Sequence, residues 1–151
     1  MFTVKYRPKT LLEVVGNKEI IKTIKSMMPN IPHMLLKGPA GVGKTTIALA
    51  IVRELGCDYK EINASDEGGI DVVRTTIKNF VNTVSMTGKF KIVILDEADF
   101  TTTDFQTALR RLMEQYATNC RFILTCNNPQ NIIEPIKSRC QGGIFEFLPI
   151  E

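Results

Sequence analysis

Apolar residues occur along this chain in two alternating patterns, one typical of strands and one typical of helices. Five segments have the length and apolar content of buried strands: 34–37, 59–62, 92–95, 121–126 and 144–147. Four segments carry apolar residues at helical spacing: 20–27, 47–55, 72–84 and 105–116. Because strands alternate with helices, the pattern predicts an α/β fold with a five-stranded, mostly parallel sheet flanked by helices.

The remaining segments refine that prediction. Residues 63–69 are small and polar, so we expect a loop there. The helix over 72–84 should begin near Asp71, as an N-cap or first-turn acid, and should include Val84 on its apolar side. A short helical or turn element is expected at 132–136, around Pro135.

The sequence GPAGVGKTT, at residues 38–46, lies between the first predicted strand and the following helix. Its spacing is that of a P-loop, in which backbone N–H groups face phosphate oxygens at the start of a helix. Lys44 would reach the β- and γ-phosphates, and the Thr45 hydroxyl would bind Mg²⁺. A chance Gly/Pro-rich turn is the alternative, but the flanking strand and helix disfavour it. The candidate nucleotide-binding residues are Gly38, Pro39, Ala40, Gly41, Val42, Gly43, Lys44, Thr45 and Thr46.

Polar residues also follow two of the predicted strands. Asp96 and Glu97 end the strand at 92–95, where Asp96 would orient Mg²⁺ and Glu97 would orient the attacking water or accept its proton. A solvated acidic turn is the alternative, and it is less favoured beside a P-loop. Asn127 follows the strand at 121–126 and could bond the γ-phosphate or hold the water, unless it only forms an Asn-Pro turn.

Several cations are further candidates. Arg139 is either an exposed charge or an arginine finger for a neighbouring subunit's triphosphate, and the residues alone leave the two interpretations even. Arg74 and Lys78 share one face of a predicted helix and could contact nucleic-acid phosphates, as could Arg110 and Arg111. Solvated helix faces are the simpler interpretation of those four. Ligands of parallel sheets bind beyond the carboxyl ends of the strands, so all the catalytic candidates, Arg139 included, should lie along one rim.

Composition adds few constraints. The chain has 151 residues, 44% of them hydrophobic and 23% charged, which indicates one folded domain. A net charge of +3 is too small to indicate a nucleic-acid partner by itself. Four cysteines without a C-x-x-C pair, and a single histidine, predict reduced thiols in an intracellular protein and no structural zinc. No apolar run approaches the ~20 residues of a membrane span.

Motifs along nearly the whole chain resemble the small subunit of replication factor C and its phage clamp-loader relatives. Those motifs are Lys5–Thr10, Val15-Gly16, His33 with the P-loop, Asn63–Asp66, Gly69–Arg74, Leu95–Asp99, Ala108–Glu114, Arg121–Leu124 and Ser138–Cys140. The resemblance implies an AAA+ ATPase with a P-loop core. Members of that family form a pentameric spiral, bind ATP between subunits and load a ring-shaped sliding clamp onto primer–template DNA. It also implies an intracellular location: the nucleus if eukaryotic, the cytoplasm or nucleoid if archaeal or phage.

The resemblance also implies residue roles. Asn127 matches sensor 1, Arg139 matches the finger that acts in trans, and Arg74 and Lys78 match contacts to the DNA backbone. The adenine would be held by Val4, Tyr6, Arg7, Val15 and Gly16. Gly68 departs from the family, which usually has an arginine there and so one more DNA contact.

Length is the largest departure. The sequence predicts one AAA+ ATPase domain over 1–151, without the family's helical lid and collar, and hence weak nucleotide affinity and little hydrolysis by the isolated domain. Two alternatives stay open at this point. One is a nucleotide-binding module that does not hydrolyse ATP. The other is a different P-loop ATPase such as a helicase, which is disfavoured because a second RecA-like domain is not found.

Overall fold

The computed structural model describes residues 17–67 and 69–148, and its centre is one parallel sheet. The strands lie in the order β2-β3-β4-β1-β5, and each neighbouring pair is parallel. Their bounds are β1 (Met34–Lys37), β2 (Tyr59–Asn63), β3 (Lys91–Asp96), β4 (Cys120–Cys126) and β5 (Ile144–Glu146). The predicted α/β fold with five strands is therefore confirmed.

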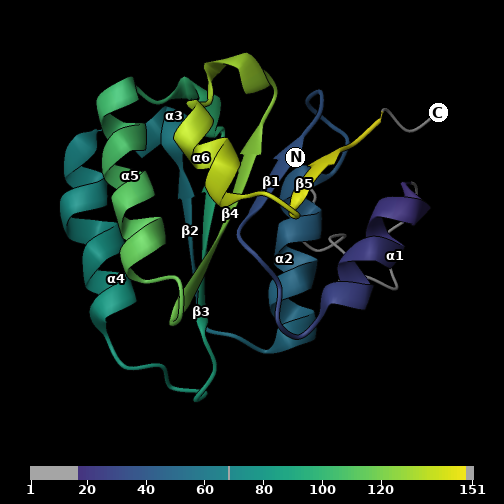
Figure 1. Cartoon of the computed structure of the whole chain (residues 1–151), viewed down its shortest axis with the longest axis horizontal. Coiled ribbons are helices and arrows are strands. Elements are labelled where there is room, and N and C mark those ends of the chain that lie inside the picture. Colours follow the sequence, from purple (N-terminus) through teal and green to yellow (C-terminus); the bar gives the residue numbers. More distant parts are fainter. Residues whose placement is uncertain (1–16, 68, 149–151) are drawn as a thin grey trace.

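Helices cover both faces of this sheet, which gives the molecule three layers (Figure 1). One face carries α1 (Lys18–Met27) and α2 (Lys44–Leu55). The other carries the π-helical segment η3 (Val72–Ile77), α4 (Lys78–Asn82), α5 (Thr103–Gln115) and α6 (Glu134–Arg139). Three single turns complete the fold: α3 (Ala64–Glu67), η4 (Ala98–Phe100) and η5 (Pro129–Asn131).

The central strands are buried on both faces because their side chains alternate between two apolar clusters. In β3, Val93 and Leu95 join the cluster under α4 and α5, whereas Ile92 and Ile94 join the cluster under α2. All four side chains are fully buried, and each such burial contributes about 1.5–3 kcal/mol. This two-sided burial explains why the strand has an unbroken apolar sequence.

The register of the sheet brings the ends of its strands together. Asn63 at the end of β2 pairs with Asp96 at the end of β3, and Lys37 at the end of β1 pairs with Cys126 at the end of β4. The segments that follow these strands must therefore leave the sheet at the same edge. We call this edge the carboxyl rim.

The structure corrects two predictions about local structure. Residues 63–69 are not all loop, because Ala64–Glu67 form the turn α3. The Oδ1 atom of Asn63 accepts hydrogen bonds from the N–H and hydroxyl of Ser65, which stabilises that turn. The helix predicted over 72–84 ends at Asn82, and Val84 is 88% exposed instead of packing on the apolar side.

Two helix starts make earlier expectations more specific. Asp71 lies in helical backbone and its side chain makes no capping hydrogen bond, so it is a first-turn acid and not an N-cap. The element expected at 132–136 is α6, which starts at Glu134 with Pro135 in its first turn. Proline is tolerated there because its missing N–H would have no helical partner.

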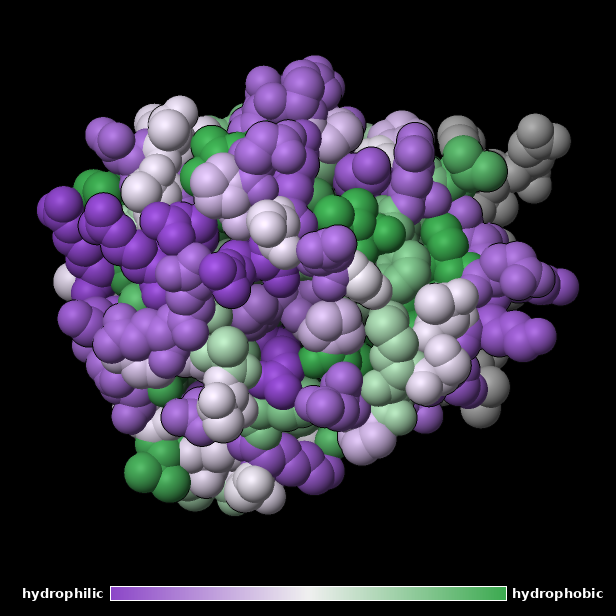
Figure 2. All heavy atoms as spheres, in the orientation of Figure 1, coloured by the Kyte–Doolittle hydropathy of each residue, from purple (hydrophilic) through white to green (hydrophobic). Residues whose placement is uncertain are grey.

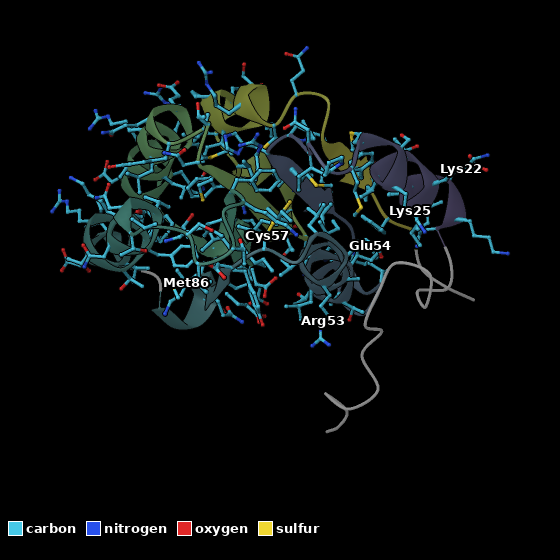
Figure 3. All side chains as sticks on the ribbon, turned by 90° about the horizontal axis from the view of Figure 1, so that it is seen from below. Lys22, Lys25, Arg53, Glu54, Cys57 and Met86 are labelled. Atoms are coloured by element: carbon cyan, nitrogen blue, oxygen red, sulfur yellow. The ribbon has the colours of Figure 1, made fainter. Side chains whose placement is uncertain are left out.

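Seen from below, α1 and α2 direct charged side chains away from the sheet (Figure 3). Lys22 of α1 and Arg53 of α2 are exposed, and Met86, in the segment after α4, is 90% exposed. None of the helices within 17–67 and 69–148 has the length and apolar content needed to cross a membrane.

Candidate active site

The P-loop leaves β1 through a close approach that only glycine allows. A Cβ atom on Gly38 would lie 2.7 Å from the carbonyl oxygen of Phe147, and the φ of Gly38 is +151°. Gly43 has a φ of +89° and is followed at once by Lys44, the first residue of α2. The N–H groups of this helix start therefore open onto the loop, which is the arrangement that binds phosphate.

Lys44 is buried at the centre of the P-loop. Its ammonium group donates hydrogen bonds to the carbonyl oxygens of Gly38 and Pro39, the latter at 3.1 Å, and to Oδ1 of Asn127 at 2.7 Å. Burial lowers the pKa of Lys44, and the carboxylates of Asp99 and Asp96 oppose part of that shift. The contact with Asn127 joins the P-loop to the end of β4.

A buried carboxylate joins the P-loop to β3. The hydroxyl of Thr45 donates a hydrogen bond of 2.8 Å to Oδ1 of Asp96, and the hydroxyl of Thr125 donates one of 3.1 Å to the same atom. Hydroxyl and carboxylate oxygens are the ligands that Mg²⁺ prefers. The donor set formed by Thr45 and Asp96 therefore fits this ion.

Glu97 follows in a backbone conformation that is unusual for its residue type. Its φ is +58°, a left-handed value that carries a cost of about 1–3 kcal/mol for a residue with a side chain. Its N–H donates to the hydroxyl of Thr125 at 3.1 Å, and its Oε1 accepts a hydrogen bond from the hydroxyl of Ser65. These contacts hold the carboxylate beside the loop.

Asp99 fixes the segment that carries Asn127. This carboxylate is buried, and its Oδ2 accepts hydrogen bonds from the N–H of Asn127 at 3.2 Å and from that of Asn128 at 2.9 Å. A cavity of about 260 Å³ lies among these groups. Its lining residues are Ala40, Gly41, Gly43, Lys44, Thr45, Thr46, Glu97, Thr125 and Asn127.

Arg139 does not lie on the carboxyl rim, contrary to the prediction. It lines a cavity of about 390 Å³ together with Asn30, Ile31, Pro32, His33, Ala117 and Arg121. Residues 30–33 precede β1, whereas the P-loop follows it, so the strand separates Arg139 from this chain's own P-loop. The physical reason is that α6 runs back along the sheet before β5 starts beside Leu35.

The other predicted cations do not line the P-loop cavity. Arg74 and Lys78 line a groove of about 460 Å³ between η3–α4 and α5, and Arg111 of α5 lines it too. Figure 2 shows hydrophilic residues gathered over this side of the molecule. Arg110 instead forms an ion pair of 2.7 Å with Glu114. The structure therefore separates two arginines that are adjacent in sequence.

The five predicted adenine contacts, Val4, Tyr6, Arg7, Val15 and Gly16, lie outside the described residues. Two other residues of the site carried no role in the sequence interpretation. In the sequence, Asp99 is the last acid of the Leu95–Asp99 motif and Thr125 is a residue of a predicted strand. The signal available for each was position: Asp99 lies three residues after Asp96, and Thr125 two residues before Asn127.

His33 supports the other end of the sheet. Its Nδ1 accepts a hydrogen bond of 3.1 Å from the N–H of Phe122, so its Nε2 carries the proton and donates to the carbonyl of Met113 at 3.0 Å. Burial is the main cause that lowers the pKa of this imidazole, and Arg121 and Arg139 add to the shift. The neutral ring thus connects the start of β1 with β4 and the end of α5.

Comparisons with known proteins agree with this architecture. The model of the "ATPase family associated with various cellular activities (AAA)" matches residues 34–146. Solved structures of RuvB from Thermotoga maritima share the fold. One, titled a Holliday junction branch migration motor, has a TM-score of 0.75 at 20% identity and covers 95% of this chain and 48% of that one. A RuvB variant has a TM-score of 0.76 at 21% identity, and the match covers 93% of this chain and 49% of the RuvB chain.

Curated archaeal proteins are much more similar in sequence, and they confirm the resemblance to replication factor C. The replication factor C small subunit of Methanocella arvoryzae is 50% identical over 99% of this chain and 48% of its own length. The replication factor C small subunit of Methanosarcina barkeri is 55% identical over 95% of this chain and 45% of its own length. The chain thus spans about half the length of these relatives.

Proposed function

The chain belongs to the AAA family of ATPases, and from this premise we propose that it is the ATP-binding and hydrolysing motor domain of a DNA sliding-clamp loader. The relatives named replication factor C small subunit support this proposal at 50–55% identity. The proposed activity is the placement of a ring-shaped clamp on primer–template DNA. Its proposed setting is inside the cell, in an assembly with other clamp-loader subunits.

ATP binds, in this proposal, with its phosphates in the P-loop. The backbone N–H groups from Ala40 to Thr46 and the ammonium of Lys44 hold the β- and γ-phosphates, whereas Gly38 and Pro39 shape the loop. Thr45 and Asp96 hold Mg²⁺, which would neutralise phosphate charge when bound. The contacts of Lys44 to carbonyl oxygens and to Asn127 support this role, because they keep its charge at the centre of the loop.

Hydrolysis is assigned to Glu97 with Asn127. Glu97 orients the attacking water and accepts its proton, and Asn127 positions that water or the γ-phosphate. Both residues line the same cavity as Lys44 and Thr45, which supports a shared role. Asp99 and Thr125 hold these groups in place through the hydrogen bonds described above.

Arg139 is the proposed arginine finger of a neighbouring subunit's site. It cannot serve its own P-loop, because β1 lies between them. Its side chain is 51% exposed, so it is available at a subunit interface. A cation supplied there would stabilise the charge that develops on the transferred phosphoryl group.

DNA contacts are assigned to the groove between η3–α4 and α5. Arg74 and Lys78 line it, and we add Arg111, which lines the same groove. These three cations line one groove, which Asp104 also lines, and each could contact a phosphate of a nucleic-acid backbone. Each contact should contribute to the salt dependence of DNA binding.

The observation that carries the proposal is the 2.8 Å hydrogen bond between Thr45 and Asp96, because it unites the P-loop with the acidic end of β3. The test is steady-state ATPase activity of the longest native polypeptide that contains this sequence, with and without primed DNA and the cognate clamp. We expect stimulation by both together. Lack of stimulation by either would contradict the clamp-loader proposal.

A second experiment tests the shared site. Glu97→Gln and Arg139→Ala polypeptides are purified separately, mixed and then assembled together. Mixed assemblies contain some sites with an intact Glu97 and an intact neighbouring Arg139, so we expect part of the activity to return. Failure to complement in a verified assembly would show that Arg139 does not act in trans.

A further inference from the structure

The base of the Arg139 side chain is rigid, although its end is exposed. Arg139 is the last residue of α6, and the next residue, Cys140, is fully buried. The N–H of Cys140 donates to the carbonyls of Ile136 and Lys137, each at 3.1 Å. The backbone at Arg139 is therefore fixed, and only its own rotatable bonds decide where the guanidinium lies.

Glu114 is the group that faces this guanidinium. Its Oε2 lies 3.0 Å from Nε of Arg139 and 2.7 Å from NH1 of Arg110. The end of α5, where Glu114 lies, is itself held by the hydrogen bond between His33 and the carbonyl of Met113. Arg110 is one helical turn away from Glu114 and orients the carboxylate toward α6.

The geometry of this contact leaves the working end of Arg139 accessible. Glu114 meets Nε, on the side of the guanidinium, and among the described residues neither terminal nitrogen of Arg139 has a hydrogen-bond partner. Those two nitrogens are the pair that binds phosphate oxygens side by side. The group of Arg110, Glu114 and Arg139 keeps a net charge of +1, so the acid does not cancel the cation.

We propose that Glu114 is a positioning residue for Arg139, which holds the guanidinium by its Nε edge and directs the two terminal nitrogens toward the phosphates of a neighbouring subunit's nucleotide. This inference rests on the proposed role of Arg139 as a finger in trans. Orientation before contact spares the flexible side chain an ordering cost when the transition state forms. The effect of Glu114 is therefore on the rate of hydrolysis and not on the affinity for ATP.

The test uses the assembled ATPase with saturating clamp and primed DNA, built from the longest native polypeptide that contains this sequence. Glu114→Gln keeps the size of the side chain and removes its charge. We expect kcat to fall about tenfold with KM for ATP unchanged within about twofold, because orientation alone is lost. Glu114→Asp, which keeps the charge on a shorter side chain, should recover part of the rate.

The matched control is Glu134→Gln, which removes the acid of another surface ion pair, at 3.4 Å from Lys137, on α6 itself. It should leave kcat unchanged, and all variants should melt within about 2 °C of the parent, as expected for surface substitutions. In an Arg139→Ala background, Glu114→Gln should have no further effect. Those results together support the inference.

Three outcomes overturn it, and they are distinguishable. If Arg139→Ala lowers kcat and Glu114→Gln does not, the positioning role is wrong and the finger assignment stands. If Glu114→Gln lowers kcat equally with and without Arg139, Glu114 acts structurally. If Arg139→Ala itself has no effect on a clamp-stimulated rate, the proposed finger fails and this inference fails with it.

Discussion

The two ends of the central strands are built differently. At the carboxyl rim, polar groups from three segments are joined directly around the buried Lys44 and Asp96, as in the hydrogen bonds from Lys44 to Asn127 and from Thr45 to Asp96. At the opposite end, Arg139 is half exposed and its contact with Glu114 is a surface ion pair. One end therefore holds a finished set of groups, and the other presents a single cation outward.

This difference separates what one chain can do alone from what it needs a neighbour to do. Groups that are already bonded to one another lose little by being ordered, so one chain alone preorganises the rim for the phosphate binding that we propose. A half-exposed arginine gains most when another molecule covers it, because its charge then acts in a drier environment. Substitutions at each end can therefore test the two separately.

The largest effect should come from Lys44→Ala at the rim. Loss of the buried ammonium removes the charge that faces the phosphates, so we expect ATP affinity and hydrolysis to fall on the order of 10²-fold or more. Nucleotide titration by calorimetry and a steady-state ATPase assay measure this. The control is Lys89→Ala, since Lys89 also donates to a backbone carbonyl, that of Leu55 at 2.7 Å, without lining the rim cavity. Equal losses in both variants would refute the special role of Lys44.

Asp99→Ala should have the next largest effect, because it leaves two N–H groups at the rim without their acceptor. We expect a loss of about 1–3 kcal/mol in the free energy of unfolding. Hydrolysis should fall about tenfold as Asn127 shifts, with ATP affinity less affected. Denaturant unfolding and the ATPase rate are the measurements. Asp71→Ala is the control, since Asp71 is exposed and makes no capping bond; an equal rate for both variants would contradict the assignment.

Thr125→Val should have a smaller effect at the same end. Valine has the shape of threonine but removes the hydroxyl that donates to Asp96 and accepts from the N–H of Glu97. We expect about 1–2 kcal/mol less stability and a severalfold lower kcat, because both acids stay in place but are less restrained. Thr76→Val, on the exposed surface, is the comparison. A Thr125→Val enzyme with unchanged kcat would show that the hydroxyl is only structural.

The same contrast explains how far the sequence predicts this molecule. At the rim, the motifs lie at strand ends: Asp96 ends β3, whereas the P-loop and Asn127 directly follow β1 and β4. A parallel sheet brings such positions together. The sequence therefore predicts both the fold and the central residues. The sequence does not predict the roles of Asp99 and Thr125, because these depend on hydrogen bonds between segments about 28 residues apart.

Arg139 shows why the remaining positions could not be predicted. Its place in the chain, just before the last strand, suggests the rim, but α6 turns back along the sheet and carries it to the opposite end. Likewise, Arg110 and Arg111 are adjacent in sequence but point in different directions from α5. Arg110 pairs with Glu114, whereas Arg111 lines the groove that also contains Arg74 and Lys78. Such differences follow from packing and not from local pattern.

The smallest predicted effect concerns His33, which supports the end of the sheet that carries Arg139. Burial lowers the pKa of His33 in the folded chain, so below about pH 6.5, the ordinary value, the unfolded chain binds a proton that the folded chain does not. Stability is therefore complete above that pH and falls as the pH decreases, with a slope of at most about 1.4 kcal/mol per pH unit.

Because the chain has one histidine, its replacement isolates the contribution of histidine protonation to the pH dependence of stability. His33→Gln keeps a donor and an acceptor without a titrating ring, so we expect a lower stability at pH 7.5 but a flatter decline between pH 7.5 and 5.5. Denaturant unfolding across that range is the measurement. If the free energy of unfolding falls with the same slope in parent and variant, His33 does not set the pH dependence. Protonation of His33 would then not weaken its support of α5 near Arg139.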